Sequence, residues 1–342
     1  MARKRLQGNR APTVHTVAKL AGVSIASASR VLNGLGASPE TEQRVRAAAA
    51  KVGYVPNAVA RSLRSRRTDM LALAVEDIGN PVYVAMMRAM ETVVRRAGYR
   101  LVVHATGADP DGEVELLDGL AKRYVDGLVL VPIRVTDAHL EALSRAAGPV
   151  VVVGALPDDV EVDNVRTDSH SGVGLALSHL VESGRRRIAL INGPLDTVPG
   201  AARQAGYLAA RDRLGLPADD ALIEIGDFRY EDGRRATERL LDRVRPDAIF
   251  CANDLIAVGA LHTLLSRGIR VPEEIALVGM DDTDLARMSF PQLSSVSLGS
   301  EERGQTAAQL LLDRLVDPDR PPARVTVPPR LVIRASSRAV RP

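Results

Sequence analysis

Two patterns of hydrophobic residues divide the chain. Near the N-terminus, Val14, Val17, Ala18 and Ala21 lie one, three or four positions apart, which is the spacing of one helix face. From Met70 onward, short runs of consecutive apolar residues alternate with segments of helical spacing. The pattern therefore predicts a small all-α head followed by a large α/β body.

The head carries start and stop signals for three helices. Thr13 is suited to cap the first helix and Gly22 to end it, and Ser24 caps a second helix that ends near Asn33. A third helix is predicted over residues 38–52, where a Ser-Pro-Glu start precedes a terminal Gly. The tight turn between the first two helices is typical of a helix-turn-helix.

The second helix has two different faces. Ala28, Val31 and Leu32 are predicted to be buried. The opposite face has side chains short enough for the helix to lie in a DNA major groove, with an arginine available for a base or a phosphate. That face consists of Ile25, Ala26, Ser27, Ser29 and Arg30.

A short basic segment, residues 57–68, follows the head. Its pattern is helical, but a helix of about nine residues is marginal alone in water, so we expect it to fold only on a polyanion. Leu63 stands among arginines, and we interpret it as an apolar wedge for the DNA minor groove.

Charge separates the head from the body. Residues 1–68 hold 13 Lys and Arg and two acids, a net charge of +11, whereas the remaining 274 residues have a net charge of −8. A polyanion is attracted to the head alone, which predicts nucleic acid as its partner. The head lacks the Trp/Phe/Leu-rich face that an anionic membrane surface would require.

The body contains eight apolar runs that predict strands. They are Leu71–Val75, Leu101–Val103, Leu128–Val131, Val150–Val153, Ile188–Ile191, Leu222–Ile225, Ala248–Cys251 and Ile275–Val278. Continuous hydrophobicity predicts parallel strands that are covered on both faces. A helix at about residues 171–182 separates the runs into two sets, which predicts two doubly wound parallel-sheet lobes.

Polar residues follow several of these strands, where doubly wound sheets bind their ligands. Carboxylates, amides, a guanidinium and aromatic rings in one cleft suit a polyhydroxylated ligand. The predicted ligand-binding residues are Asp77, Asn80, Tyr83, Arg203, Phe228, Asn253 and Asp281. As alternatives, Asn253 and Asp254 only cap a helix, Phe228 is only a core residue, and Asp282 only supports a turn.

Enzymatic and metal-dependent functions are not indicated. The six histidines show no metal-binding spacing, and neither a Gly-x-Ser-x-Gly elbow nor a phosphate-binding Gly-x-x-x-x-Gly-Lys loop is present, so we predict no catalytic residue, metal or cofactor. Cys251 lies in an apolar run and is predicted to be a buried residue rather than a reactive thiol. Without a signal peptide or an apolar run of about 20 residues, the protein is expected to be cytoplasmic, with no membrane partner.

Five strings in the head form a distinctive set. They are Ala21-Gly22-Val23-Ser24, Ser29-Arg30-Val31-Leu32-Asn33-Gly34, Ser38-Pro39-Glu40-Thr41, Gly53-Tyr54-x-Pro56-Asn57 and Ala60-Arg61-Ser62-Leu63. This set resembles the lactose-repressor (LacI-type) family of bacterial transcription regulators, and the resemblance extends over about residues 13–338. It implies DNA contacts by Thr13, Val14, His15, Ser24, Ile25, Ala26, Ser27, Ser29, Arg30, Asn33, Thr41, Tyr54, Asn57, Ala60, Arg61 and Leu63.

The body shares the same resemblance, which implies a periplasmic-binding-protein-like pair of lobes. Arg203, Phe228, Asn253 and Asp281 match positions where sugar-responsive members hold their effector. Three departures limit what is carried over: Gly154 stands where many members present an acid, Leu298 stands at an often polar position, and the loop between Asn33 and Ser38 is one residue short. The resemblance therefore does not imply a simple galactoside as ligand, nor contacts from that loop.

These observations predict a ligand-responsive, sequence-specific DNA-binding regulator, a repressor of a sugar-utilisation operon. We expect a homodimer on a pseudo-palindromic operator, associated with the nucleoid, with a sugar or sugar derivative as effector. The expected parts are a disordered tail (1–12), a DNA-binding domain (13–56), a hinge helix (57–68) and an effector-binding and dimerisation domain (69–342). Its N-lobe comprises about 69–167 and 299–327, and its C-lobe about 168–298 and 328–340. The alternative is a two-lobed solute-binding protein without DNA function, which would have no use for a basic head.

Overall fold

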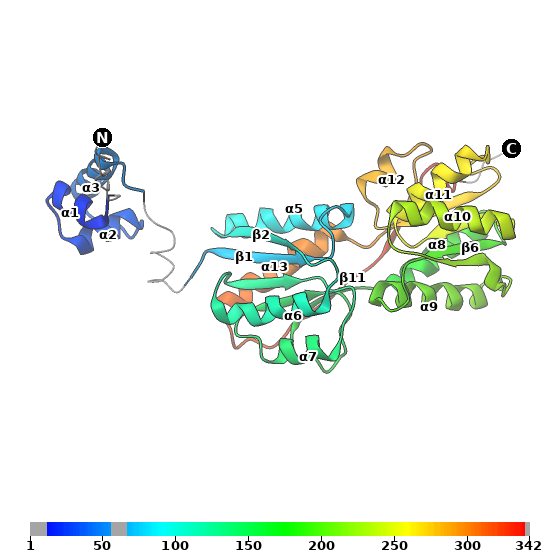
Figure 1. The fold of residues 1–342 in the computed structure, drawn as a ribbon, viewed down its shortest axis with the longest axis horizontal. Helices are drawn as coiled ribbons and strands as arrows, with labels where there is room; N and C mark the ends of the chain where they lie inside the picture. Colours follow the sequence, from blue (N-terminus) through cyan, green and yellow to red (C-terminus); the bar gives the residue numbers. More distant parts are fainter. Residues whose placement is uncertain (1–11, 56–66, 339–342) are drawn as a thin grey trace, which may run out of the picture. The chain divides into compact units, whose positions relative to one another are not determined.

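The computed structural model describes residues 12–55 and 67–338. The chain forms two compact units, Met1–Thr68 and Asp69–Pro342 (Figure 1). The predictions for the basic tail and the hinge helix fall almost entirely on residues 1–11 and 56–66. They therefore lie outside the described residues, as do Asn57, Ala60, Arg61 and Leu63.

The first unit contains α1 (Val14–Ala21), α2 (Ile25–Leu32) and α3 (Pro39–Val52). The side chains of Thr13, Ser24 and Ser38 each accept a hydrogen bond from the backbone N–H three residues later, which caps the three helices as the sequence predicts. One shared core holds the helices together, with Val17, Ala18, Ala28, Val31 and Val45 among its buried residues.

An arginine of α3 fixes the turn between α1 and α2. The Arg44 guanidinium donates to the carbonyl of Ala21 from Nε (3.0 Å) and to that of Gly22 from Nη2 (2.8 Å). Gly22 has a φ of 64°, which glycine adopts without steric cost. The helix-turn-helix geometry is therefore held by hydrogen bonds to the turn as well as by the apolar core.

The second unit contains two six-stranded sheets. The first sheet has the order β11-β5-β4-β3-β1-β2 and the second β12-β10-β9-β8-β6-β7. The first consists of β1 (Met70–Val75), β2 (Arg100–Ala105), β3 (Gly127–Leu130), β4 (Val150–Val153), β5 (Asp163–Thr167) and β11 (Arg324–Val327). The second consists of β6 (Ile188–Asn192), β7 (Ile223–Ile225), β8 (Ala248–Cys251), β9 (Ala276–Met280), β10 (Ser294–Ser297) and β12 (Arg330–Val332). The strands pair in parallel, except that β12 runs antiparallel to β10.

Helices cover both faces of each sheet (Figure 1). We call the first sheet and its helices the N-lobe, which contains α5 (Pro81–Arg96), α6 (Pro110–Gly119), η1 (Leu120–Lys122), α7 (Asp137–Ser144) and α13 (Ser300–Val316). The C-lobe contains α8 (Ser169–Glu182), α9 (Val198–Arg213), η2 (Asp220–Leu222), α10 (Tyr230–Arg243), α11 (Asp254–Ser266) and α12 (Asp284–Met288). The described chain passes between the lobes three times, after β5, β10 and β11.

Alternate residues of β1 show why its apolar run is continuous. Leu71 and Leu73 belong to the same core cluster as residues of α5 and α13, whereas Ala72 and Ala74 belong to the cluster with α6 and α7. The prediction that both faces are covered is wrong for β2, in which Val102 is 40% exposed. β2 is the edge strand of its sheet, and its second face is left open.

Candidate functional site

A cleft lies between the two lobes of the second unit, beyond the carboxyl ends of the strands. Its lining includes Glu76 after β1, Pro132 after β3 and Gly154 after β4, together with Asn253 after β8 and Asp281 after β9. About 830 Å³ of empty space lies in the cleft, counted together with the solvent at its open mouth. The position agrees with the rule for doubly wound sheets.

Six of the seven predicted ligand-binding residues line this cleft. They are Asn80, Tyr83, Arg203, Phe228, Asn253 and Asp281. Asp77 is not part of the lining. The Asp77 side chain is exposed, and its carboxylate accepts the Gly79 N–H at 2.8 Å, so it closes the turn that leads to α5.

A buried ion pair lies at the centre of the site. Nη2 of Arg203 is 3.7 Å from Oδ1 of Asp281, and both residues are more than nine-tenths buried. Burial raises the pKa of Asp281, while Arg203 and Arg303 oppose that rise, and burial lowers the pKa of Arg203. A charged donor and a charged acceptor held side by side away from water are suited to bind ligand hydroxyls.

Phe228 provides an apolar surface beside this pair. The guanidinium carbon of Arg203 lies 5.3 Å from the centre of the Phe228 ring, a cation–π contact. The ring packs directly on Gly193, where a Cβ atom would lie 2.2 Å from the ring carbon Cζ. Phe228 is therefore packed against the core, and it also lines the cleft.

Asn253 caps a helix and also positions the aromatic residue. Its Oδ1 accepts the Ile256 N–H at 2.8 Å at the start of α11, and its Nδ2 donates to the carbonyl of Phe228 at 3.0 Å. Asn253 thus caps α11, and its side chain also lines the cleft. Asp282 is not in the lining, and its Oδ1 accepts from Nη2 of Arg334 at 2.6 Å.

Asp254 lies beneath the site and supports the Asp281 segment. Its carboxylate accepts from Oγ of Ser295 (2.6 Å) and from the backbone N–H and hydroxyl of Thr283 (2.7 and 2.8 Å). Burial, followed by the nearby charge of Asp281, raises the pKa of Asp254 to about 7. This carboxyl group therefore holds the loop after β9 in place.

Four polar side chains of the lining are absent from the predicted set of ligand-binding residues: Glu76, Thr167, Ser169 and Arg303. Burial, and then Asp77, raises the pKa of Glu76. Within the described residues, Oγ1 of Thr167 and Nε of both Arg203 and Arg303 are buried without a hydrogen-bond partner. Buried polar groups are normally hydrogen-bonded, so these three atoms are candidates for ligand contacts.

In the head, the candidate DNA-binding residues differ in their exposure. On α2, Ile25 is 44% exposed, and Ala26 and Arg30 are also exposed, with Nη2 of Arg30 donating to the carbonyl of Leu35. Three further candidates are exposed, namely Thr13, His15 and Ser24. Three others are half-buried, namely Ser27, Ser29 and Thr41. Val14 and Tyr54 instead pack half-buried against the head core, and Asn33 donates to the Ser29 carbonyl at 2.7 Å. The short side chains of α2 thus form an outward face, whereas Val14, Tyr54 and Asn33 have internal contacts.

Two further features were looked for in the described residues: a membrane-spanning helix and a metal-binding group. No helix in residues 12–55 or 67–338 is long and apolar enough to cross a bilayer. The same residues contain no group of three His, Cys, Asp or Glu side chains arranged for a metal ion. Cys251 is fully buried in the C-lobe core, as expected, and burial raises the pKa of its thiol.

Comparison with known proteins matches both parts of the chain. Residues 13–57 match the model of the lacI family of bacterial regulatory proteins, and residues 177–337 match a periplasmic binding protein-like domain. The HTH-type transcriptional regulator CelR of Thermobifida fusca is 37% identical over 97% of this chain and 100% of its own.

Solved structures give the same result. A CelR–cellobiose complex is 35% identical with a TM-score of 0.72, covering 95% of this chain and 99% of the other. The lac repressor dimer bound to operator and the anti-inducer ONPF is 26% identical with a TM-score of 0.85, covering 96% and 99%.

Proposed function

The chain belongs to the lacI family of bacterial regulatory proteins and is a DNA-binding transcription regulator, and from this premise we propose that a sugar bound in the cleft controls its affinity for an operator. The observation that carries the proposal is the buried Arg203–Asp281 pair, which lies beside unpaired polar atoms in a cleft between two lobes. The regulator represses a sugar-utilisation operon and has no catalytic activity of its own. It acts in the cytoplasm, at the nucleoid, where its operator lies.

The effector binds to residues of both lobes. Asn80 and Tyr83 belong to α5 of the N-lobe, whereas Arg203, Phe228, Asn253 and Asp281 belong to the C-lobe. A ligand held by both sets favours one relative arrangement of the lobes. This arrangement sets the spacing of the two hinge segments in a dimer, and the hinge spacing sets operator affinity.

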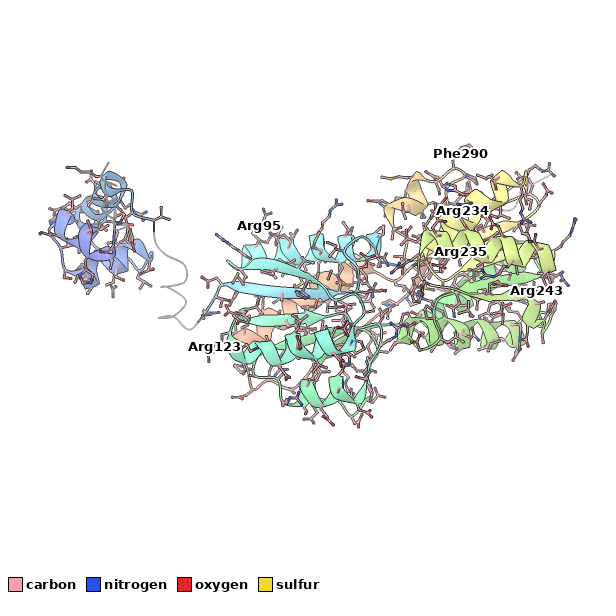
Figure 2. All side chains as sticks on the ribbon, in the orientation of Figure 1. Arg95, Arg123, Arg234, Arg235, Arg243 and Phe290 are labelled. Atoms are coloured by element: carbon pink, nitrogen blue, oxygen red, sulfur yellow. The ribbon has the colours of Figure 1, made fainter. Side chains whose placement is uncertain are left out.

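The protein acts as a homodimer on a pseudo-palindromic operator, because one short helix-turn-helix reads only half a site. Apolar side chains of the body are available for this association: Val102 on the edge strand β2, Met288 at the end of α12, and Phe290 just after α12. Phe290 is 90% exposed and projects from the C-lobe (Figure 2). Burial of such side chains between two copies removes apolar surface from water.

Calorimetry and DNA titration on the full-length protein test the proposal. A thermal-shift screen with glucose, galactose, ribose, cellobiose and their acidic derivatives identifies a binding sugar, and a duplex selected from random-sequence DNA serves as operator. Arg203→Lys and Asp281→Asn each remove part of the charged hydrogen bonding, so we expect ligand binding to weaken by about 1.5–3 kcal/mol.

Without ligand, operator affinity should remain close to that of the wild type, because the head is a separate compact unit. The response of operator affinity to the sugar should be lost. Arg95→Met, on the exposed end of α5 (Figure 2), is the control. Normal sugar affinity in both cleft variants would reject this site, and chemical turnover of the sugar would reject the non-enzymatic assignment.

A further inference from the structure

Arg303 enters the cleft from the first turn of α13, where it is only 8% exposed. Its position is fixed by the next residue, because a Cβ atom on Gly304 would lie 2.4 Å from the carbonyl oxygen of Met86. The backbones of α13 and α5 are therefore in direct contact at this point. A long side chain that leaves α13 here has little freedom to move away from the cleft.

The charge of Arg303 has no close counter-ion among the described residues. Nη2 donates to Oγ of Ser300 at 3.1 Å, and Nε is buried without a hydrogen-bond partner. Burial lowers the pKa of Arg303, and Asp281 and Tyr83 only partly offset this effect, while Arg203 adds to it. A buried guanidinium costs free energy unless an anion pairs with it.

The carboxylates that line the cleft do not form an ion pair with Arg303. Asp281 is in ion-pair contact with Arg203, at 3.7 Å. Glu76 is half-buried in the same lining, and the positive charges of Arg134 and Arg229 oppose the rise of its pKa. Among the described residues, Arg303 is therefore the arginine of the cleft lining that has no carboxylate in ion-pair contact.

We propose that the effector carries one anionic group, a carboxylate or a phosphate, which the guanidinium of Arg303 binds while Arg203 and Asp281 bind the sugar hydroxyls. This inference rests on the proposed function of the cleft and specifies the class of ligand. The planar fork of arginine matches the geometry of both anions. Arg303 belongs to the N-lobe and Arg203 to the C-lobe, so an acidic sugar joins the lobes through charged contacts from both sides.

The test is calorimetry on the full-length protein with matched pairs of ligands. The pairs are glucose with glucuronate, galactose with galacturonate, cellobiose with cellobionate, and ribose and glucose with their terminal phosphates. For at least one pair, the acidic member should bind wild type at least tenfold more tightly than the neutral member. Preference for a uronate or aldonate identifies a carboxylate, and preference for a sugar phosphate identifies a phosphate.

Three variants assign this preference to one side chain. Arg303→Met keeps the length of the side chain but removes its charge, and should weaken binding of the acidic member ten- to a hundredfold without weakening that of the neutral member. Arg303→Lys keeps the charge and should retain part of the preference. Arg95→Met removes a distant exposed charge on α5 and should change nothing.

The outcomes separate this inference from the proposed function. Equal binding of neutral and acidic members, unchanged by Arg303→Met but weakened by Arg203→Lys, would overturn the anionic ligand and keep the sugar-responsive cleft. The absence of binding by every sugar, neutral or acidic, would overturn both. If Arg303→Met does not fold, the wild-type preference and the Arg303→Lys variant still decide the question.

Discussion

Arg134 of the N-lobe and Asp196 of the C-lobe form an ion pair across the two lobes, with 2.9 Å between Nε and Oδ2. The neighbouring backbones are also joined, because the Val198 N–H donates to the carbonyl of Ile133 at 2.8 Å. The hydrogen bond from Arg134 lowers the pKa of Asp196. Both contacts can form only when these edges of the lobes are close together.

We therefore predict that this ion pair contributes to closure of the lobes on the effector. Asp196→Asn removes the charge but leaves the backbone hydrogen bond, so sugar affinity should fall by less than about tenfold, as expected for a solvent-exposed pair. Raising the salt concentration should weaken sugar binding to wild type and leave the variant much less affected.

The measurement is calorimetry at two salt concentrations. Arg145→Met is a suitable control, because Arg145 pairs with Asp118 inside the N-lobe and both side chains are exposed. The same salt dependence in wild type and in Asp196→Asn would show that the ion pair does not contribute to closure.

A second prediction concerns the head. Arg30 is exposed on the outward face of α2, and we expect it to read a base, so Arg30→Ala should reduce discrimination between operator and random duplex by about 1–3 kcal/mol. Arg66, which lies outside the described residues, is expected to contact a phosphate. Arg66→Ala should weaken binding to both duplexes and reduce the salt slope by about one.

Competition binding with both duplexes at several salt concentrations separates these effects. Circular dichroism of Arg30→Ala provides a check on folding, because Arg30 also bonds the carbonyl of Leu35. Equal losses on operator and random duplex would remove Arg30 from the residues that read bases.

The sequence predicted those strands whose buried residues form a continuous apolar run. The run from Leu71 to Val75 is continuously apolar because helices cover both faces of β1, and this pattern is visible without any partner. Strand β5 was missed because it begins with two polar residues, Asp163 and Asn164. Both are buried, and their partners include the distant Ala323 N–H and the nearby Val152 carbonyl.

Strand β10 was missed for the same reason. Its first two residues, Ser294 and Ser295, are fully buried and bond to Ser336 and Asp254, which lie more than 40 positions away. Such partners cannot be identified from a local pattern of polar residues.

The residues of the site were likewise predictable only in part. Asn253 and Asp281 closely follow apolar strands, so their positions were predictable from the rule for sheet edges, whereas Arg203 lies within α9 and was assigned from the family resemblance. Arg303 follows a Ser-Glu-Glu start, which is typical of an exposed first helical turn. Only the packing of α13 against α5 places its side chain in the cleft, and that contact joins segments more than 200 positions apart.

The last prediction concerns the pH dependence of stability. The pKa of Asp254 is about 7 in the folded protein because of burial and the charge of Asp281, whereas an unfolded Asp has a pKa near 3.8. Between these two values the folded state binds more protons than the unfolded state. The contribution of this group to the free energy of unfolding is therefore greatest below about pH 4 and decreases as pH rises to about 7, by at most about 1.4 kcal/mol per pH unit.

Asp254→Asn should remove this decrease while preserving the fold. With Oδ1 accepting from Thr283 and Nδ2 donating to Oγ of Ser295, the amide reproduces the hydrogen bonds of the protonated acid. Chemical denaturation from pH 5 to pH 7.5 should thus show a flatter profile for the variant. Asp242→Asn, an exposed carboxylate on α10, is the control. Parallel profiles for wild type and Asp254→Asn would mean that Asp254 is ionised in the folded protein throughout this range, stabilised by its three hydrogen bonds.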